Sequence, residues 1–390
     1  MSKRRDGAKS SVELVKGNAA LRGANRLLRA GVPFDPEDKG LPRGLRRFGK
    51  QLGILQTALD VSTRPAPVEP GKKATYVHRP HLGQETIGHQ LYKAKARDPL
   101  FMLQALGRIE RGMRREVDVF DGELAHVKLL EDGVGELDFW WQFLEMGEKV
   151  SLPPALLAWA TAHHAHSAGR LQGWLEMDHW IEHRHMAEEG EVELQTHAIA
   201  TALSKLDWPT PKKERKRLGA YLSERIRKTH AAALELDMED LEGGLHELRR
   251  KLRWVGVYGR ALDGALILDD KAAPPKNWER YLTPAIVQSP YAKLPDADPE
   301  VEPIVLPAPL FQALTAIIND LGDVKDRAQF TETAEMGLRA IGSREKASKW
   351  LGKTVTTHHT AAKLAHAMLD QTIVTDKLLL RLADAVDAQL

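Results

Sequence analysis

The sequence contains no cysteine among its 390 residues. This absence excludes disulfide bonds, thiolate metal sites and cysteine nucleophiles, and it fits a reducing compartment. No apolar run is long enough to cross a bilayer. The basic start MSKRRDGAKSS is not followed by the apolar segment of a signal peptide. These absences predict a cytoplasmic protein with no membrane span.

The sequence also lacks the motifs of several enzyme classes. It has no P-loop, no dinucleotide-binding fingerprint, no nucleophile elbow and no convincing pair of carboxylates. Because nothing in the chain requires catalysis, we expect a binding protein that needs no cofactor rather than an enzyme.

Charge is unevenly distributed along the chain. The formal net charge is only +2, from 56 Lys and Arg against 54 Asp and Glu. Residues 1–97 hold 20 of these basic and 8 of these acidic residues, a difference of +12, which leaves 36 against 46, or −10, in the remainder. A basic N-terminal third on an acidic remainder indicates a polyanionic partner.

The first 97 residues are interpreted as a basic N-terminal extension, partly helical or disordered. Ser11–Ala30 and Leu41–Leu59 have the pattern of helices, and the prolines of Val61–His81 are typical of a linker. We expect this extension to act as an accessory anchor or a partner-binding arm.

Residues 98–390 have helical periodicity and no alternating run long enough to predict a strand. The predicted fold is therefore all-α. We expect two pseudo-symmetric antiparallel helical bundles, at about 98–206 and 211–390. A proline-rich insertion at 270–309 interrupts the second bundle, since residues 274–309 hold nine of the 21 prolines.

The segment Leu241–Leu266 is predicted to be one long amphipathic helix. Its leucines and valines recur at three- and four-residue spacing and therefore share one face. The other face carries a run of basic side chains: His246, Arg249, Arg250, Arg253 and Arg260. Arginine binds phosphate oxygens with a planar, bidentate and always-charged group. A solvated helix surface is the alternative interpretation.

The same basic spacing occurs earlier in the chain. Two groups share it: Arg108, Arg111 and Arg115 in the first, and His246, Arg249 and Arg253 in the second. An acidic, glycine-containing turn is predicted after each group, at Leu130–Asp138 and at Ile318–Asp326. Gly133 and Gly135 are thus expected to end the first helix. The repeat predicts two related bundles that each present one basic helix.

The second group resembles the signature of a known family. The signature residues are His246, Arg249, Arg253 and Trp254, followed downstream by Leu321, Gly322 and Asp326. This pattern resembles the CHAD family of histidine-containing α-helical domains, over roughly residues 98–390 and best over 211–335. The resemblance implies two helical bundles related by a pseudo-twofold axis, which bind inorganic polyphosphate along a basic surface or channel. Some members associate with polyphosphate or polyhydroxyalkanoate granules.

The resemblance therefore predicts non-catalytic binding of inorganic polyphosphate. A linear polyanion without bases needs a track of cations, and three arginines at i, i+3 and i+7 span roughly 10 Å of it. Such binding should weaken steeply with salt. The expected phosphate contacts are Arg108, Arg111, Arg115, Lys212, Lys213, Lys216, Arg217, His246, Arg249, Arg250, Arg253 and Lys325.

Two other interpretations stay open at this point. The basic N-terminal arm could bind DNA or RNA while an arginine-faced helix enters a groove. The sequence His179-x-x-Glu182-His183 matches the H-x-x-E-H pattern of zinc hydrolases, within a histidine-rich segment from His163 to His197. Histidines on the polar faces of helices are the alternative interpretation of that segment.

Overall fold

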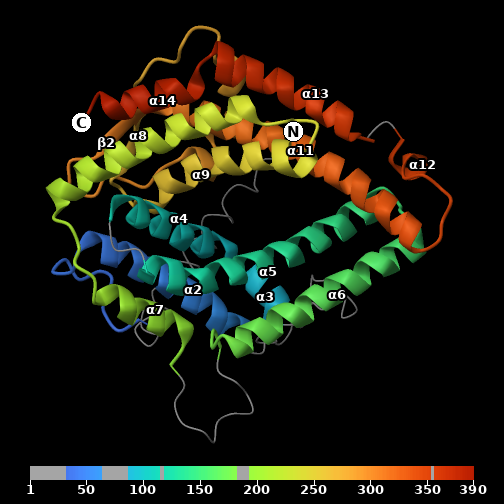
Figure 1. The fold of residues 1–390 in the computed structure, drawn as a ribbon, viewed down its shortest axis with the longest axis horizontal. Coiled ribbons are helices and arrows are strands. Elements are labelled where there is room, and N and C mark those ends of the chain that lie inside the picture. The colour runs from blue at the N-terminus through green and yellow to red at the C-terminus, as the bar shows by residue number, and fades with distance from the viewer. Residues whose placement is uncertain (1–31, 64–86, 115–117, 182–192, 353–354) are drawn as a thin grey trace, which may run out of the picture.

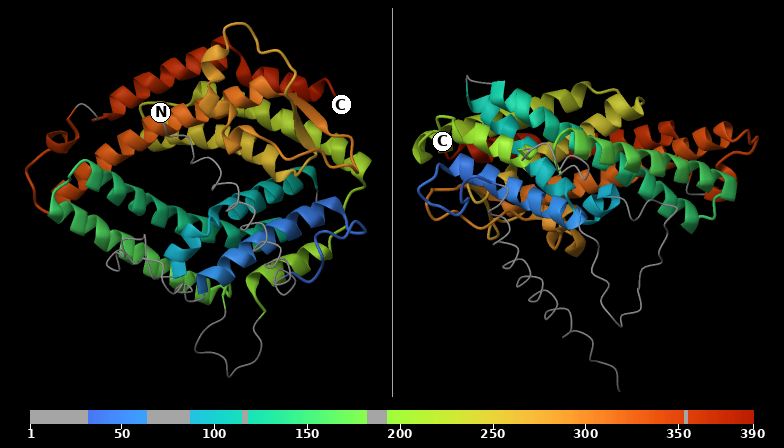
Figure 2. Two further views of the ribbon diagram at one scale, coloured as in Figure 1. Left: turned by 180° about the vertical axis from the view of Figure 1, so that it is seen from behind. Right: turned by 90° about the horizontal axis from the view of Figure 1, so that it is seen from below.

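The computed structural model describes residues 32–63, 87–114, 118–181, 193–352 and 355–390. Most of these residues are helical and very few are in strands, which confirms the predicted all-α class. The helices form two halves. Figure 1 shows the half made by α2 to α7 on one side of the molecule and the half made by α8 to α14 on the other. Figure 2 shows the same arrangement from behind and from below.

The N-terminal half is built on three helices that pack in sequence order. The middle one, α5, contacts both α4 and α6, and α2 covers α3, α4 and α7. The helices of this half are α2 (Arg43–Thr63), α3 (Ile87–Lys93), α4 (Arg97–Met113), α5 (Asp118–Lys149), α6 (Pro154–Met177) and α7 (Gln195–Ser204).

The C-terminal half is organised around one central helix, α11, which contacts α9, α13 and α14. Its long helices are α8 (Pro211–Glu235), α9 (Glu247–Ala261), α11 (Ala308–Ala340), α13 (His358–Leu369) and α14 (Leu378–Asp387). Short elements join them: η3 (Leu241–His246), η4 (Glu279–Tyr281), α10 (Pro284–Val287), η5 (Pro290–Ala292), α12 (Ser348–Leu351) and η7 (Asp370–Thr375).

The helix predicted over Leu241–Leu266 ends early, at Ala261. Gly264 has a φ of +86°, and a Cβ there would lie 2.4 Å from the carbonyl oxygen of Asp296, so only glycine fits this turn. The chain then forms strand β1 (Leu266–Asp269), which pairs in parallel with β2 (Ile304–Pro307). Sequence periodicity missed this sheet because four residues are too few to show alternation.

The two predicted glycine turns are wrong. Gly133 and Gly135 lie inside α5, and Gly322 lies inside α11, so each predicted turn is the middle of a helix of more than 30 residues. The glycines serve close packing instead. A Cβ on Gly133 would approach the side chains of Leu171 and Trp174 of α6 to 3.0 Å. The break in the first basic helix comes earlier, since α4 ends at Met113.

Part of the basic N-terminal region is built into the helical body. Phe48 and Leu52 of α2 are fully buried. Two arginines of α2 also tie the halves together: Arg47 Nη1 lies 2.5 Å and Arg43 Nη1 lies 3.5 Å from the buried carboxylate of Glu214 in α8. These two cations form ion pairs inside the protein and are therefore not available to a ligand. The expected helix Ser11–Ala30 lies outside the described residues.

Two histidines lie in the interior of the N-terminal half. His89 and His164 have no exposed surface, and their rings are 6.1 Å apart. Burial lowers the pKa of each to about 4. Neither nitrogen of His164 has a hydrogen-bond partner in the described structure. Both side chains are therefore neutral in the folded protein at pH 7.

Buried neutral histidines should make the fold sensitive to acid. An unfolded histidine has a pKa near 6.5, so the unfolded state takes up protons first and stability falls as the pH drops below 6.5. We expect His164 to cost about 2 kcal/mol by pH 5. Urea unfolding at pH 7 and pH 5 should show a smaller acid loss for His164→Leu than for His166→Leu, an exposed neighbour. Equal losses in both variants would contradict this assignment.

Candidate functional site

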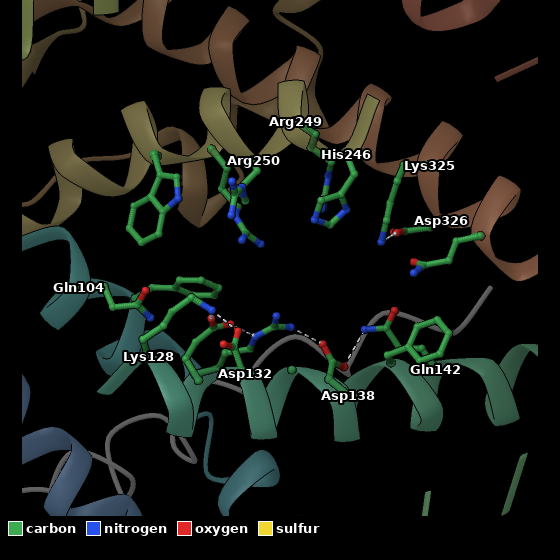
Figure 3. A pocket seen from close by; sticks show the side chains of 18 of the residues that line it. Gln104, Lys128, Asp132, Asp138, Gln142, His246, Arg249, Arg250, Lys325 and Asp326 are labelled. Carbon is green, nitrogen blue, oxygen red and sulfur yellow. Dashed lines mark hydrogen bonds and ion pairs between the residues drawn. The ribbon is translucent and has the colours of Figure 1, made fainter. Parts of the chain in front are cut away.

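A cavity of about 400 Å3 lies between the two halves. Helices α4 and α5 line one side of it, and α9 and α11 line the other (Figure 3). The halves meet at both ends of this cavity. At one end α4 packs on α9, and at the other the rings of Phe143 in α5 and Phe330 in α11 lie 4.9 Å apart.

Basic side chains outnumber acidic ones in this cavity. It is lined by seven lysines and arginines and by four aspartates and glutamates, a difference of +3 before any contribution from His246. The cations are Arg97, Arg108, Lys128, Arg249, Arg250, Arg253 and Lys325. The carboxylates are Glu131, Asp132, Asp138 and Asp326.

Two of the three cations on the α4 and α5 side, Arg97 and Lys128, are neutralised by neighbouring carboxylates, and the third, Arg108, is not. Arg97 donates hydrogen bonds to Glu131 Oε1 at 3.0 Å and to Asp138 Oδ2 at 2.7 Å. Lys128 forms an ion pair with Asp132, one turn away on α5. This wall of the cavity is therefore close to neutral.

The opposite wall contains cations that no carboxylate neutralises. Within the described residues, neither Arg249 nor Arg253 has an acidic partner within ion-pair distance. The buried donors Arg249 Nε and, on the facing helix α4, Gln104 Nε2 have no acceptor, and the buried ring nitrogen His246 Nδ1 has no hydrogen-bond partner. Buried donors without acceptors are rare in folded proteins. They are the groups that an anion in the cavity would satisfy.

Burial, together with repulsion between like charges, lowers two pKa values in this wall. Burial, followed by repulsion from Arg249, lowers the pKa of Arg253 to about 10, so the side chain stays charged at neutral pH. Burial, followed by repulsion from Lys325, lowers the pKa of His246, which keeps its ring neutral. The repulsion, which is the second cause in each case, comes from like charges that lie close together in this wall.

Aromatic rings support the guanidinium groups. Arg97 and Arg253, from opposite halves, both lie over the ring of Phe101, at 5.3 Å and 4.5 Å from its centroid. Arg108 lies over the ring of Trp254 at 3.9 Å. These cation–π contacts hold the cations in place without neutralising them.

The two halves position one arginine each in the same way. A Cβ on Gly135 would lie 2.8 Å from Arg97 Nη2, and a Cβ on Gly322 would lie 2.8 Å from Arg249 Nε. A Gln and a Phe line the cavity seven and eight residues after each glycine, namely Gln142 and Phe143 after the first and Gln329 and Phe330 after the second. The structure thus matches Arg97, rather than Arg111, with Arg249.

The structure brings half of the residues expected from the sequence to the cavity. Those that line it are Arg108, His246, Arg249, Arg250, Arg253 and Lys325. Arg111 instead forms an exposed ion pair with Asp121 at 2.9 Å. The residues that are exposed on the first turns of α8, away from the cavity, are Lys212, Lys213, Lys216 and Arg217. Arg115 lies outside the described residues.

The sequence pattern does not identify Arg97, Phe101 and Gln104 as cavity residues, because Arg97 falls at the end of the predicted N-terminal extension and neither Phe101 nor Gln104 carries a positive charge. A signal for it was present. The spacing of Gly135, Gln142 and Phe143 in α5 recurs as Gly322, Gln329 and Phe330 in α11, and this repeat marks α5 and α11 as matching helices. Arg108, Arg111 and Arg115 form a longer run of arginines, so charge spacing alone favours them over Arg97.

The histidine-rich segment does not form a metal site in the described part of the chain. No three or more His, Asp and Glu side chains gather there at a distance that could hold a metal ion. His163 stacks on the ring of Trp140 with centroids 4.5 Å apart. Glu182, His183 and His185 lie outside the described residues.

Comparison with known proteins gives no relative: no family model, no curated protein and no solved structure matches this chain. Among the described helices, none combines the length and the apolar composition that crossing a membrane requires.

The two matched arginines should contribute differently to stability. Arg97→Ala would leave the largely buried Asp138 without its cation and Glu131 with only the more distant Lys128, at 3.7 Å, and we expect a loss of about 2 to 3 kcal/mol. Arg249→Ala would remove a cation that has no partner, so we expect no loss or a gain of up to about 1 kcal/mol. Urea unfolding of both variants without ligand would measure this. An equal loss in both would mean that Arg249 is part of the structural framework.

Proposed function

We propose that this protein binds a linear polyanion, inorganic polyphosphate, in the cavity between its halves, without catalysis. The observation that carries the proposal is the set of unneutralised cations on α9, together with the buried donors Arg249 Nε and Gln104 Nε2, which lack acceptors, and the unpartnered ring nitrogen His246 Nδ1. Phosphate oxygens fit these groups, because guanidinium donates paired hydrogen bonds to them.

The position of the basic face favours polyphosphate over duplex nucleic acid. A recognition helix must protrude in order to enter a major groove. The basic face of α9 instead points across the cavity toward α5, as Figure 3 shows for His246, Arg249 and Arg250. A thin chain of phosphates fits between two helices where a duplex does not.

The matched placement of Arg97 on Gly135 and Arg249 on Gly322 also supports the resemblance to the CHAD family. We interpret this match as a sign of the pseudo-twofold relation between the two bundles that the resemblance implies. Under this proposal the protein works in the cytoplasm, and a polyphosphate or polyhydroxyalkanoate granule would be a place where it gathers.

The proposal is tested by titrating the protein with long-chain polyphosphate at near-physiological salt, with and without excess duplex DNA. We expect tight binding that survives the DNA. Arg249→Ala with Arg253→Ala should weaken it by roughly 100-fold, since each lost charge-assisted contact costs about 1.5 kcal/mol or more. The matched control, Lys212→Ala with Lys213→Ala, removes the same charge from an exposed surface and should change affinity less than about threefold. Equal effects of the two pairs would refute the site.

Binding should also depend on pH through His246. The pKa of this side chain is lowered in the free protein, and nearby phosphates would raise it, so binding would take up a proton. We therefore expect affinity to increase as the pH falls from 8 to 6, by no more than about tenfold per pH unit for one proton. His246→Gln should abolish most of this dependence, because glutamine does not titrate. An unchanged slope in that variant would place the titrating group elsewhere.

A further inference from the structure

A second cavity, of about 210 Å3, adjoins the first between α8 and α9. Three residues line both cavities: Arg108 of α4 and Arg250 and Trp254 of α9. The guanidinium of Arg108 lies 3.9 Å from the centroid of the Trp254 ring. The two cavities therefore meet at this pair.

The second cavity is more strongly basic than the first. It is lined by five cations and one carboxylate, that of Glu247. Glu247 is engaged by Arg250 at 2.7 Å and by Lys251 at 3.0 Å. The other cations are Arg108, Arg225 and Lys228.

Two of these cations have no acidic partner. Within the described residues, neither Arg108 nor Arg225 lies within ion-pair distance of a carboxylate. Arg225 donates only to the hydroxyl of Tyr221, at 3.2 Å. Lys228 pairs with Glu224 one turn away, where both side chains are exposed and the pair contributes little.

A row of aromatic rings lies between the cations of the first cavity and those of the second. Trp254 and Tyr258 are stacked with centroids 5.8 Å apart, and Tyr258 lies 6.1 Å from Tyr221. Arg108 covers the first ring of the row and Arg225 lies over the last, 5.5 Å from its centroid. The guanidinium groups thus follow one continuous strip from α4 across α9 to α8.

We propose that the second cavity continues the first and holds the part of a phosphate chain that extends beyond it. This inference rests on the proposed function and adds a property to it, selection by chain length. A short oligophosphate fills the central cavity alone, while a long chain also contacts Arg225 and Lys228. The long chain therefore gains affinity that the short one lacks.

The test compares two ligands, tripolyphosphate and long-chain polyphosphate, on Arg225→Gln with Lys228→Gln. The variant is expected to bind long chains about tenfold more weakly. Its slope of log affinity against log salt should fall by about 1 to 1.5, the value for two lost phosphate contacts on a single strand. Affinity for tripolyphosphate should not change.

The matched control is Lys212→Gln with Lys213→Gln, on the same helix α8. These side chains are exposed and line neither of the two cavities, and their substitution removes the same charge. At near-physiological salt, charges farther away than about 8 Å are largely screened, so this pair of substitutions should not change the affinity for either ligand. Circular dichroism would confirm that both variants keep their helices.

The possible outcomes separate the inference from the proposed function. Wild-type protein that binds neither ligand overturns both. Wild-type protein that binds both, with unchanged long-chain affinity in the Arg225 and Lys228 variant, overturns only the second cavity. Equal weakening by the control pair shows diffuse charge and overturns it too. Weakening for tripolyphosphate as large as for long chains shows one compact site instead of an extension.

Discussion

The close passage of an arginine side chain over a glycine of the facing helix sets the position of a cation on each side of the cavity. Arg97 crosses α5 at Gly135, and Arg249 crosses α11 at Gly322. A methyl group at either glycine would approach the guanidinium nitrogens to less than 3 Å, so the bare backbone is what lets each arginine lie along the cavity wall. A glycine inside a helix costs about 1 kcal/mol relative to alanine. That cost is borne twice, at matching places.

The two arginines then meet opposite electrostatic surroundings. Glu131 and Asp138 neutralise Arg97. Arg249 instead faces Lys325 and Arg253, which share its sign. In the N-terminal half the arginine is thus part of a structural ion-pair network, and in the C-terminal half the matching arginine faces the cavity without an acidic partner. Sites that hold unbalanced charge are usually functional, because folding alone gives no reason to keep them.

Sequence reasoning predicted some of this organisation and missed other parts for identifiable reasons. Helical periodicity gave the all-α class, and spacing on one helix face placed His246, Arg249 and Arg253 together. It failed at glycines, because Gly135 and Gly322 look like helix ends when read locally, while their role depends on an arginine from a distant helix. It also failed for Lys212 and Lys213, since a run of positive charge does not reveal which way a helix faces.

The ion pairs of Glu214 have a consequence for the way a ligand enters. This one carboxylate of α8 holds Arg43 and Arg47 of α2, and the halves also touch at Phe143 and Phe330. The two halves are therefore joined on both sides of the cavity, and one half does not open and close against the other. Association should then be a single step whose rate rises linearly with ligand concentration, because no closing motion follows the encounter. A preorganised site of this kind also loses little conformational entropy on binding.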